Sequence, residues 1–230
     1  MTRRELLELI RGDILLARVF DHVARLDQHD AAHGLEHLLR VALGTIRLGA
    51  NRVDRREAVL AALLHDVVNP PKDHPERALA STRSMLAARE LLAGTNLDAD
   101  AVERIAQAIE DHSHSRGAKP RSALGEALQD ADRLEALGAL GIARTFSTGA
   151  RLGAHYFHPD DPWGEHRALD DKRYSVDHFF TKLLALPGTF CTVRGRAEAA
   201  ERIELLKRFL EALGEEIGSP LPRPAEAGRP

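Results

Sequence analysis

The sequence has little cysteine, no excess of one charge and no long apolar run. Among its 230 residues Cys191 is the only cysteine, which excludes an intramolecular disulfide framework and fits a reducing compartment. The formal net charge of −3 produces no field that would attract DNA or anionic lipid. No apolar run approaches the roughly 18 residues of a membrane span, and the N-terminus lacks the apolar core of a cleavable signal peptide. We therefore expect a cytoplasmic protein that has neither a nucleic-acid polymer nor a membrane as its partner.

The alternation of Val, Ile and Thr with polar residues that marks a half-buried strand is also nearly absent. Leucine and alanine instead recur at spacings of three and four, which is typical of amphipathic helices. The sequence therefore predicts an all-α fold, a helical bundle with no sheet. The expected helices cover residues 3–26, 33–50, 54–68, 75–93, 98–113, 122–136, 138–150, 172–186 and 193–214.

The length of the chain and the breaks in this pattern indicate its domain organisation. We expect a single helical domain over residues 1–213, followed by a Pro-rich, disordered tail over residues 214–230. Residues 151–171 break the helical pattern and are too long for a plain connector. They form either an ordered surface loop or a lid that stacks Trp163 on a nucleotide base.

Polar side chains interrupt two of the apolar helical segments. In the first segment His33, His37 and Arg40 share the helix face opposite a leucine stripe. In the second segment His65 and Asp66 lie on a face of small alanines, which would let another helix come close. A carboxylate buried there is costly unless it is paired or bound to a metal ion. The doublet is therefore either a hydrogen-bonded pair at a helix end or part of a metal site.

Asp130 and Asp132 lie in a third apolar helical segment, although Asp is a poor helix former. A divalent ion held by two imidazoles and two carboxylates would compensate for their burial. Such mixed nitrogen and oxygen ligands suit Mn, Fe, Co, Ni or Zn better than Ca, and the lack of thiolate ligands disfavours a structural zinc site. The sequence therefore predicts one divalent metal ion held between helices.

The same residues occur in a recognisable order, with His37 in HxxRV, His65-Asp66 in ALLHD and Asp132 in ADRL. This order resembles the HD-domain superfamily of metal-dependent phosphohydrolases. The blocks HDVVNPPKDHPER, IEDHSHS, QDADRLEALGALGIARTF and LDDKRYSVDHFFTKLLALPGTF resemble one bacterial subfamily of small HD hydrolases that includes nucleotide pyrophosphatases. The resemblance covers about residues 20–212. It implies an all-helical fold and a phosphate ester or anhydride substrate, attacked by a metal-activated water.

The resemblance places the metal ligands at His37, His65, Asp66 and Asp132. Asp130 competes for the last position. Because residues two apart on a helix point about 200° away from each other, only one of the two aspartates can face the ion. The ADRL arrangement recurs in several HD branches, so Asp132 is preferred. A second ion, Mg²⁺ bound with the substrate, is also compatible with the resemblance.

This chemistry assigns further roles. Asp66, beside the ion, is expected to orient or deprotonate the attacking water. Lys72, in a loop fixed by prolines, is expected to stabilise negative charge that develops in the reaction. Other cations and imidazoles near the motifs are candidates for substrate binding, namely His33, Arg77, His112, Arg133, Lys172 and Arg173.

The residues after the HD doublet narrow the range of expected substrate classes. Branches that hydrolyse guanosine tetraphosphate carry Glu-Asp where this chain has Asn69 and Pro70, and the five-prime deoxynucleotidases carry a Glu at the first of these positions. The glycine-tyrosine-proline block of the cyclic-dinucleotide branch is absent. We therefore expect a small phosphate substrate, foremost a nucleotide. A nucleoside triphosphate would yield either a monophosphate and pyrophosphate or free phosphate.

Two other classes of protein remain open. A non-catalytic, metal-binding helical regulatory module would keep the ligands without turnover. The stretch His33-x-x-Glu36-His37 also matches the inverted zinc-peptidase pattern, in which two His bind zinc and Glu activates water. The peptidase interpretation leaves the HD doublet and Asp132 unexplained.

Overall fold

The computed structural model describes residues 1–26, 34–70, 76–113 and 119–222. Over these residues the all-α prediction is confirmed, and the only β-type pairing is an isolated bridge between His155 and Tyr174. The elements are α1 (Arg3–Gly12), α2 (Ile14–Leu26), α3 (Leu35–Gly49), η1 (Ala50–Arg52), α4 (Arg55–Leu64), η2 (Arg77–Leu79), α5 (Ala80–Leu92), α6 (Ala99–Asp111), α7 (Ala123–Leu134), α8 (Gly138–Arg151), α9 (Asp177–Thr181), η4 (Leu183–Thr189) and α10 (Val193–Glu216).

These elements fall into two compact units. The first comprises Met1–Glu135 and Phe190–Arg196, and the second comprises Ala136–Thr189 and Ala197–Pro230. The expected single domain over residues 1–213 stays a prediction. Of the expected tail, α10 takes up the first residues, and residues 223–230 lie outside the described part. None of the described helices combines the length and the apolar character needed to cross a membrane.

Two expected helices differ from the structure. The segment 3–26 is broken at Asp13, whose extended backbone ends α1 and whose Oδ1 accepts hydrogen bonds from the amides of Leu15 and Leu16 at 2.9 and 3.0 Å. A side chain that caps the next helix in this way competes with continuation of the first one. The segment 172–186 contains only the short α9 and the start of η4.

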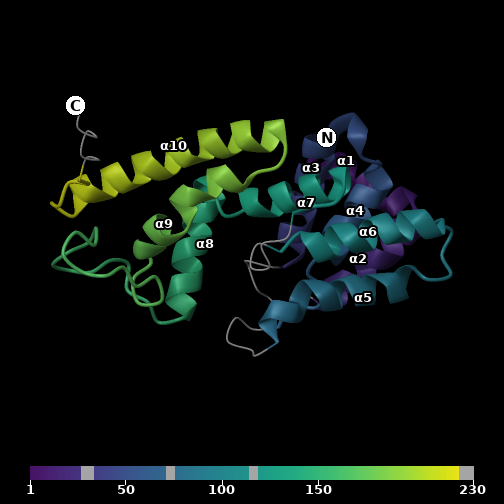
Figure 1. Ribbon diagram of the computed structural model, residues 1–230, viewed down its shortest axis with the longest axis horizontal. Coiled ribbons are helices and arrows are strands. Elements are labelled where there is room, and N and C mark those ends of the chain that lie inside the picture. The colour runs from purple at the N-terminus through teal and green to yellow at the C-terminus, as the bar shows by residue number, and fades with distance from the viewer. Residues whose placement is uncertain (27–33, 71–75, 114–118, 223–230) are drawn as a thin grey trace. The chain divides into compact units, whose positions relative to one another are not determined.

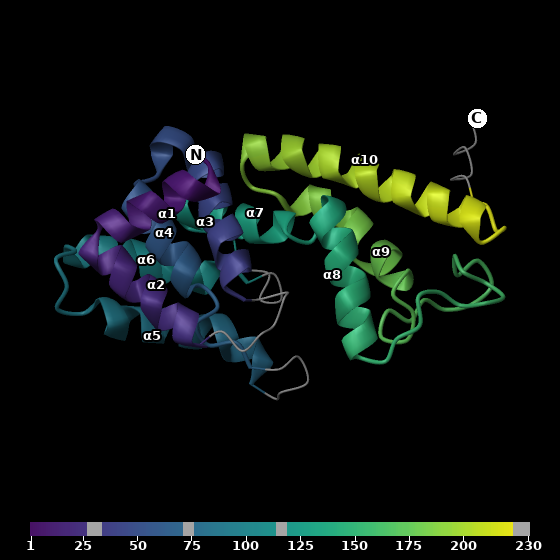
Figure 2. The ribbon, with the colours of Figure 1, turned by 180° about the vertical axis from the view of Figure 1, so that it is seen from behind.

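Helix α4 lies at the centre of the first unit, in contact with α2, α3, α6 and α7 (Figures 1 and 2). It begins at Asp54, whose Oδ1 accepts hydrogen bonds from the amides of Arg56 and Glu57. Every residue from Ala58 to Leu64 is completely buried, as its apolar and small-residue faces predict. The helix ends directly before the HD doublet, so its packing in the core fixes the position of His65 and Asp66.

Helices α3 and α7 approach each other closely at Gly44 and Ala131. A Cβ atom built on Gly44 would lie 2.9 Å from the Cβ of Ala131, closer than two carbons normally approach. The absence of a side chain at residue 44 therefore sets the spacing of the two helices. His37 precedes Gly44 by about two helical turns and Asp132 directly follows Ala131, so this contact also sets the distance between those two side chains.

The second unit is built around α8, α9 and the longer part of α10. Phe179 stacks on Phe209 with ring centroids 5.7 Å apart, which joins α9 to α10. Trp163 is buried, and its Nε1 donates a hydrogen bond to the Ser219 carbonyl at 2.9 Å. Residues 151–171 thus contain an ordered, packed stretch, which favours the surface-loop interpretation over a lid that stacks Trp163 on a base.

The contact between α3 and α7 leads to a test by matched glycine substitutions. Gly44→Ala is expected to lower the free energy of unfolding by about 1–3 kcal/mol, because the added methyl group overpacks the helix contact. Gly12→Ala, where nothing lies within 4 Å of the added Cβ, is the control and should not destabilise the protein. Chemical denaturation measures both. Equal effects of the two substitutions would contradict the proposed constraint.

Candidate metal centre

Five polar side chains from four helices of the first unit meet in one cluster. His37 comes from α3, His65 and Asp66 from the end of α4, His112 from the end of α6 and Asp132 from α7. The three imidazoles are almost completely buried, with 5% or less of each residue exposed. Residues distant in the sequence therefore form a single, largely enclosed group of nitrogen and oxygen ligands.

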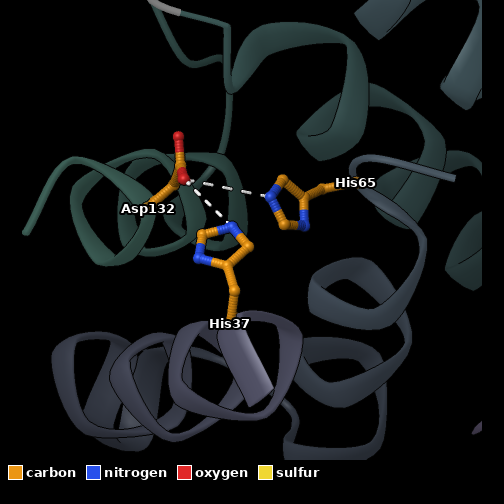
Figure 3. A group of neighbouring side chains, drawn as sticks. All are labelled: His37, His65 and Asp132. Atoms are coloured by element: carbon orange, nitrogen blue, oxygen red, sulfur yellow. Dashed lines mark ion pairs between the residues drawn. The ribbon is translucent and has the colours of Figure 1, made fainter. Parts of the chain in front are cut away.

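One part of the cluster brings His37, His65 and Asp132 together. The Oδ1 of Asp132 lies 3.5 Å from Nε2 of His37 and 3.9 Å from Nε2 of His65 (Figure 3). The potential ligand atoms of these three residues all lie within 4.8 Å of one another. This spacing leaves room for one cation among them, with ligands of the type that divalent transition metals accept.

The other part of the cluster brings His65, Asp66 and His112 together, so His65 belongs to both. The Asp66 carboxylate lies 3.4 Å from Nε2 of His65 through Oδ2 and 3.6 Å from Nε2 of His112 through Oδ1. The sequence assigns His112 to substrate binding. The structure places it directly against a predicted ligand, in a group that itself has the spacing of a metal site.

Backbone carbonyls fix the orientation of two of the imidazoles. Nδ1 of His65 lies 2.8 Å from the Ala62 carbonyl, and Nδ1 of His112 lies 2.6 Å from the Ile109 carbonyl. Because a carbonyl only accepts hydrogen bonds, each Nδ1 must carry the proton. In the neutral ring Nε2 is then the atom with the free lone pair. Both rings therefore present a metal-binding nitrogen to the cluster.

The side chains of the cluster also suit a metal ion. Nε2 of His65 is completely buried and has no hydrogen-bond partner among the described residues. A buried polar atom without a partner normally costs about 1–3 kcal/mol. A cation at this position would satisfy the lone pair of His65. It would also offset the negative charge of Asp66 and Asp132.

The charges in the cluster favour a cation as well. Burial lowers the pKa of His65, which keeps its imidazole neutral. Burial alone would raise the pKa values of Asp66 and Asp132, but the neighbouring imidazoles outweigh it and hold both values below the usual range. For His112 burial opposes the charged form, yet the Asp66 carboxylate raises its pKa. Two ionised carboxylates and a neutral His65 are the protonation states that bind a divalent ion.

Asp130 lies outside the cluster, as expected for a residue two positions from Asp132. Its carboxylate accepts hydrogen bonds from the amides of Cys191 and Thr192 at 2.8 and 2.7 Å and from the Thr192 hydroxyl at 2.7 Å. Thr192 in turn caps α10 by accepting a hydrogen bond from the Gly195 amide. The burial of Asp130 is thus compensated within the protein, which supports Asp132 as the metal ligand.

The other predicted site residues have different surroundings. His33 and Lys72 lie outside the described residues, as does the side chain of Arg77, which begins η2. Arg133 is buried on α7 beside Asp132, and desolvation lowers its pKa. Lys172 and Arg173 are exposed in the second unit, where Arg173 lies over the ring of Tyr174. Their contribution to substrate binding stays a prediction.

Glu36 does not lie in the arrangement that a zinc peptidase needs. Its carboxylate is bound by the guanidinium of Arg3, with Oε2 at 3.1 Å from Nε and Oε1 at 2.5 Å from Nη2. The side chain is 60% exposed. Glu36 is thus engaged at the surface while His37 points into the core, which argues against Glu36 as a water-activating base beside a metal ion.

Glu135 was not predicted as a site residue. It is buried directly after α7, and its Oε2 lies 3.4 Å from Nδ1 of His37. Burial raises its pKa, but hydrogen bonds with His37 and Arg40 outweigh this effect and lower it. Its spacing of three residues from Asp132, which places both carboxylates on one helix face, is a signal that could have identified it.

Comparison with known proteins is consistent with this geometry. Residues 34–137 match the family model of the HD domain, a segment that contains the whole cluster. The protein YpgQ of Bacillus subtilis (strain 168) is 29% identical over 194 residues, which cover 84% of this chain and 88% of YpgQ. These findings confirm the resemblance to the HD superfamily.

Two solved structures extend the similarity to the fold. A crystal structure of an HD-superfamily hydrolase from Bacillus thuringiensis is similar with a TM-score of 0.65 and 28% identity, over 94% of this chain and 99% of that one. A crystal structure of B. subtilis YpgQ in complex with ADP has a TM-score of 0.65 and 25% identity, over 87% of this chain and 93% of that one. Both relatives are matched over nearly their full length.

The two neighbouring aspartates provide a test of the metal centre. Asp132→Asn is expected to abolish stoichiometric metal binding while the protein stays folded, because one charged ligand is lost. Asp130→Asn is expected to keep the ion but to lower the free energy of unfolding by about 2–4 kcal/mol, because a buried acceptor of three hydrogen bonds is altered. Elemental analysis after equilibration with Mn²⁺, together with chemical denaturation, measures both. Metal loss in the Asp130 variant alone would refute the ligand assignment.

Proposed function

We propose that this chain, which carries an HD domain over residues 34–137, is a metal-dependent phosphohydrolase that acts on a small phosphate ester or anhydride. The substrate that we favour is a nucleotide, with hydrolysis of a nucleoside triphosphate to a monophosphate and pyrophosphate or with release of phosphate. The observation that carries this proposal is the buried cluster in which the HD doublet meets His37 and Asp132. The ADP in the YpgQ structure supports a nucleotide as the ligand class.

His37, His65, Asp66 and Asp132 would hold the ion, and His112 is positioned to join them through Nε2. When bound, a divalent cation supplies Lewis-acid activation of water and neutralises charge on phosphoryl oxygens. Mixed imidazole and carboxylate ligands suit Mn, Co, Ni, Fe or Zn. Mg²⁺ would enter with the substrate, because it retains water and binds through phosphate oxygens.

The side chains of the chain perform the remaining steps in this proposal. Asp66 has a pKa well below its usual range, so its carboxylate is ionised at neutral pH. The ionised carboxylate can orient the attacking water or accept a proton from it. Nε2 of His112 lies 3.6 Å from Oδ1 of that carboxylate. Lys72 and the cations proposed for substrate binding would stabilise the negative charge of the phosphate during displacement.

Activity against nucleotides tests this proposal directly. With Mn²⁺, Co²⁺ or Ni²⁺ added, the protein is expected to release pyrophosphate or phosphate from a panel of nucleotides. Asp66→Ala should reduce the rate by at least about 100-fold and remove the bound ion, because the same carboxylate serves the ion and the water. Product analysis by anion-exchange chromatography distinguishes the two types of cleavage.

Glu36→Gln is the matched control for that variant, because it neutralises an exposed carboxylate on the same helix as His37. Its activity should equal that of the wild type. Loss of activity in this control, or cleavage of casein, would instead favour the peptidase alternative. Stoichiometric metal without turnover of any nucleotide would favour the regulatory-module alternative.

The proposed role of Lys72 can be tested separately. Lys72→Ala is expected to keep the metal ion and to lower kcat/KM by about 10–100-fold, because a charge that stabilises the transition state is removed. Lys119→Ala, which removes an exposed lysine, is the control and should leave kcat/KM unchanged. Steady-state kinetics at saturating metal measures both. A Lys72→Ala enzyme as active as the control would exclude the role.

A further inference from the structure

We propose that Glu135 is a positioning residue that holds the His37 imidazole in the orientation and tautomer required to bind a metal ion. The inference deepens the proposed function and rests on it, since it concerns the same centre. Glu135 itself does not lie among the ligand groups of the cluster. It contacts Nδ1 of His37, on the edge of the ring opposite the nitrogen that faces the cluster.

The geometry places the His37 ring between two carboxylates from one helix end. Nε2 of His37 lies 3.5 Å from Oδ1 of Asp132, and Nδ1 lies 3.4 Å from Oε2 of Glu135. Asp132 belongs to the last turn of α7, and Glu135 is the residue directly after that helix. Because residues three apart share a helix face, α7 presents one carboxylate to each nitrogen of the same imidazole. Figure 3 shows the ring of His37 directed from α3 toward Asp132.

The position of His37 in its helix explains why it needs such a partner. His65 and His112 follow the last turn of a helix, where a carbonyl three residues earlier is available to Nδ1. His37 instead lies in the first turn of α3, and the carbonyl three residues earlier, that of Gly34, accepts hydrogen bonds from the amides of His37 and Leu38. A side chain from another helix must therefore fix its ring.

Arg40 completes the arrangement. Its Nε donates a hydrogen bond to the same Oε2 of Glu135 at 2.8 Å, from one turn further along α3 than His37. Glu135 is only 4% exposed, and a buried carboxylate is costly without a charged or hydrogen-bonding partner. Arg40 supplies the charge that keeps Glu135 in place as a pure acceptor. Because an ionised carboxylate can only accept a hydrogen bond, a neutral His37 must carry its proton on Nδ1 to bind Glu135. The lone pair of Nε2 is then available to the ion.

The test is the metal affinity of Glu135→Gln, measured by competition with a chromophoric chelator and Mn²⁺ or Zn²⁺. Carboxylates that orient metal-bound histidines typically contribute 10–100-fold to affinity, so we expect binding weaker by about this factor. Glu135→Asp, which keeps the charge on a shorter side chain, should recover part of the affinity. Affinity equal to wild type in the Gln variant would overturn the proposal.

Glu57→Gln is the matched control. Glu57 is also a buried carboxylate of the first unit that binds an arginine, with Oε2 at 3.0 Å from Nε of Arg104. Its substitution removes a comparable ion pair away from the imidazoles. If Glu57→Gln weakens metal binding as much as Glu135→Gln does, the effect is general destabilisation and the positioning role is refuted.

A second measurement needs neither metal nor substrate. The ¹⁵N chemical shifts of the imidazoles in the metal-free protein report which nitrogen carries the proton, and His37→Gln identifies the signal of residue 37. We expect the Nδ1–H tautomer in the wild type and a mixture of tautomers in Glu135→Gln. The same tautomer in both proteins would contradict the inference.

These measurements separate the inference from the proposed function. A wild type that binds metal but hydrolyses no phosphate compound would refute the phosphohydrolase proposal, while the affinity comparison would still decide the role of Glu135. A wild type that binds no divalent ion would overturn both.

Discussion

The close approach of α3 and α7 is the constraint on which the candidate metal centre depends. Asp has a short side chain, so its carboxylate reaches an imidazole on another helix only when the two backbones are near each other. Gly44 permits this approach at Ala131, the residue before Asp132. The completely buried stretch of α4 from Ala58 to Leu64 fixes the position of a third ligand group, because its core packing determines where His65 emerges. Packing between apolar and small residues thus sets the distances between the polar ones.

The cluster also shows how a protein core can hold several imidazoles at moderate cost. Each ring satisfies Nδ1 with a protein acceptor and turns Nε2 toward the carboxylates of Asp66 and Asp132. Hydrogen bonding on one edge compensates for part of the desolvation, and the other edge remains available to a cation. The acceptors of the Nδ1 protons differ because the three histidines occupy different positions in their helices. A ring at a helix end uses its own backbone, whereas a ring in a first turn requires a carboxylate from a neighbouring helix.

Local information in the sequence was sufficient for the helical class, and the resemblance carried by the HD motif blocks is confirmed by the comparisons. Periodicity predicted α4 as a buried helix, and the spacing of Asp130 and Asp132 predicted that only one of them faces the cluster. The break at Asp13 was missed because a capping side chain there resembles any polar residue of an amphipathic pattern. The partners of Asp130 and Glu135 are distant in the sequence or lie on another helix, and such contacts are set by tertiary packing that periodicity does not report.

The hydrogen bonds of Asp130 have a consequence for the order in which the protein can be completed during synthesis. Its three donors belong to Cys191 and Thr192, which are part of the first unit although the residues of the second unit from Ala136 to Thr189 precede them in the chain. While the ribosome is still producing that intervening stretch, the Asp130 carboxylate, two residues before the proposed metal ligand Asp132, lacks the groups that compensate for its burial. The first unit therefore completes its hydrogen bonds only after residues 190–196 have been synthesised. In a nascent chain that stops before residue 190, the Asp130 carboxylate of α7 would lack its three donors.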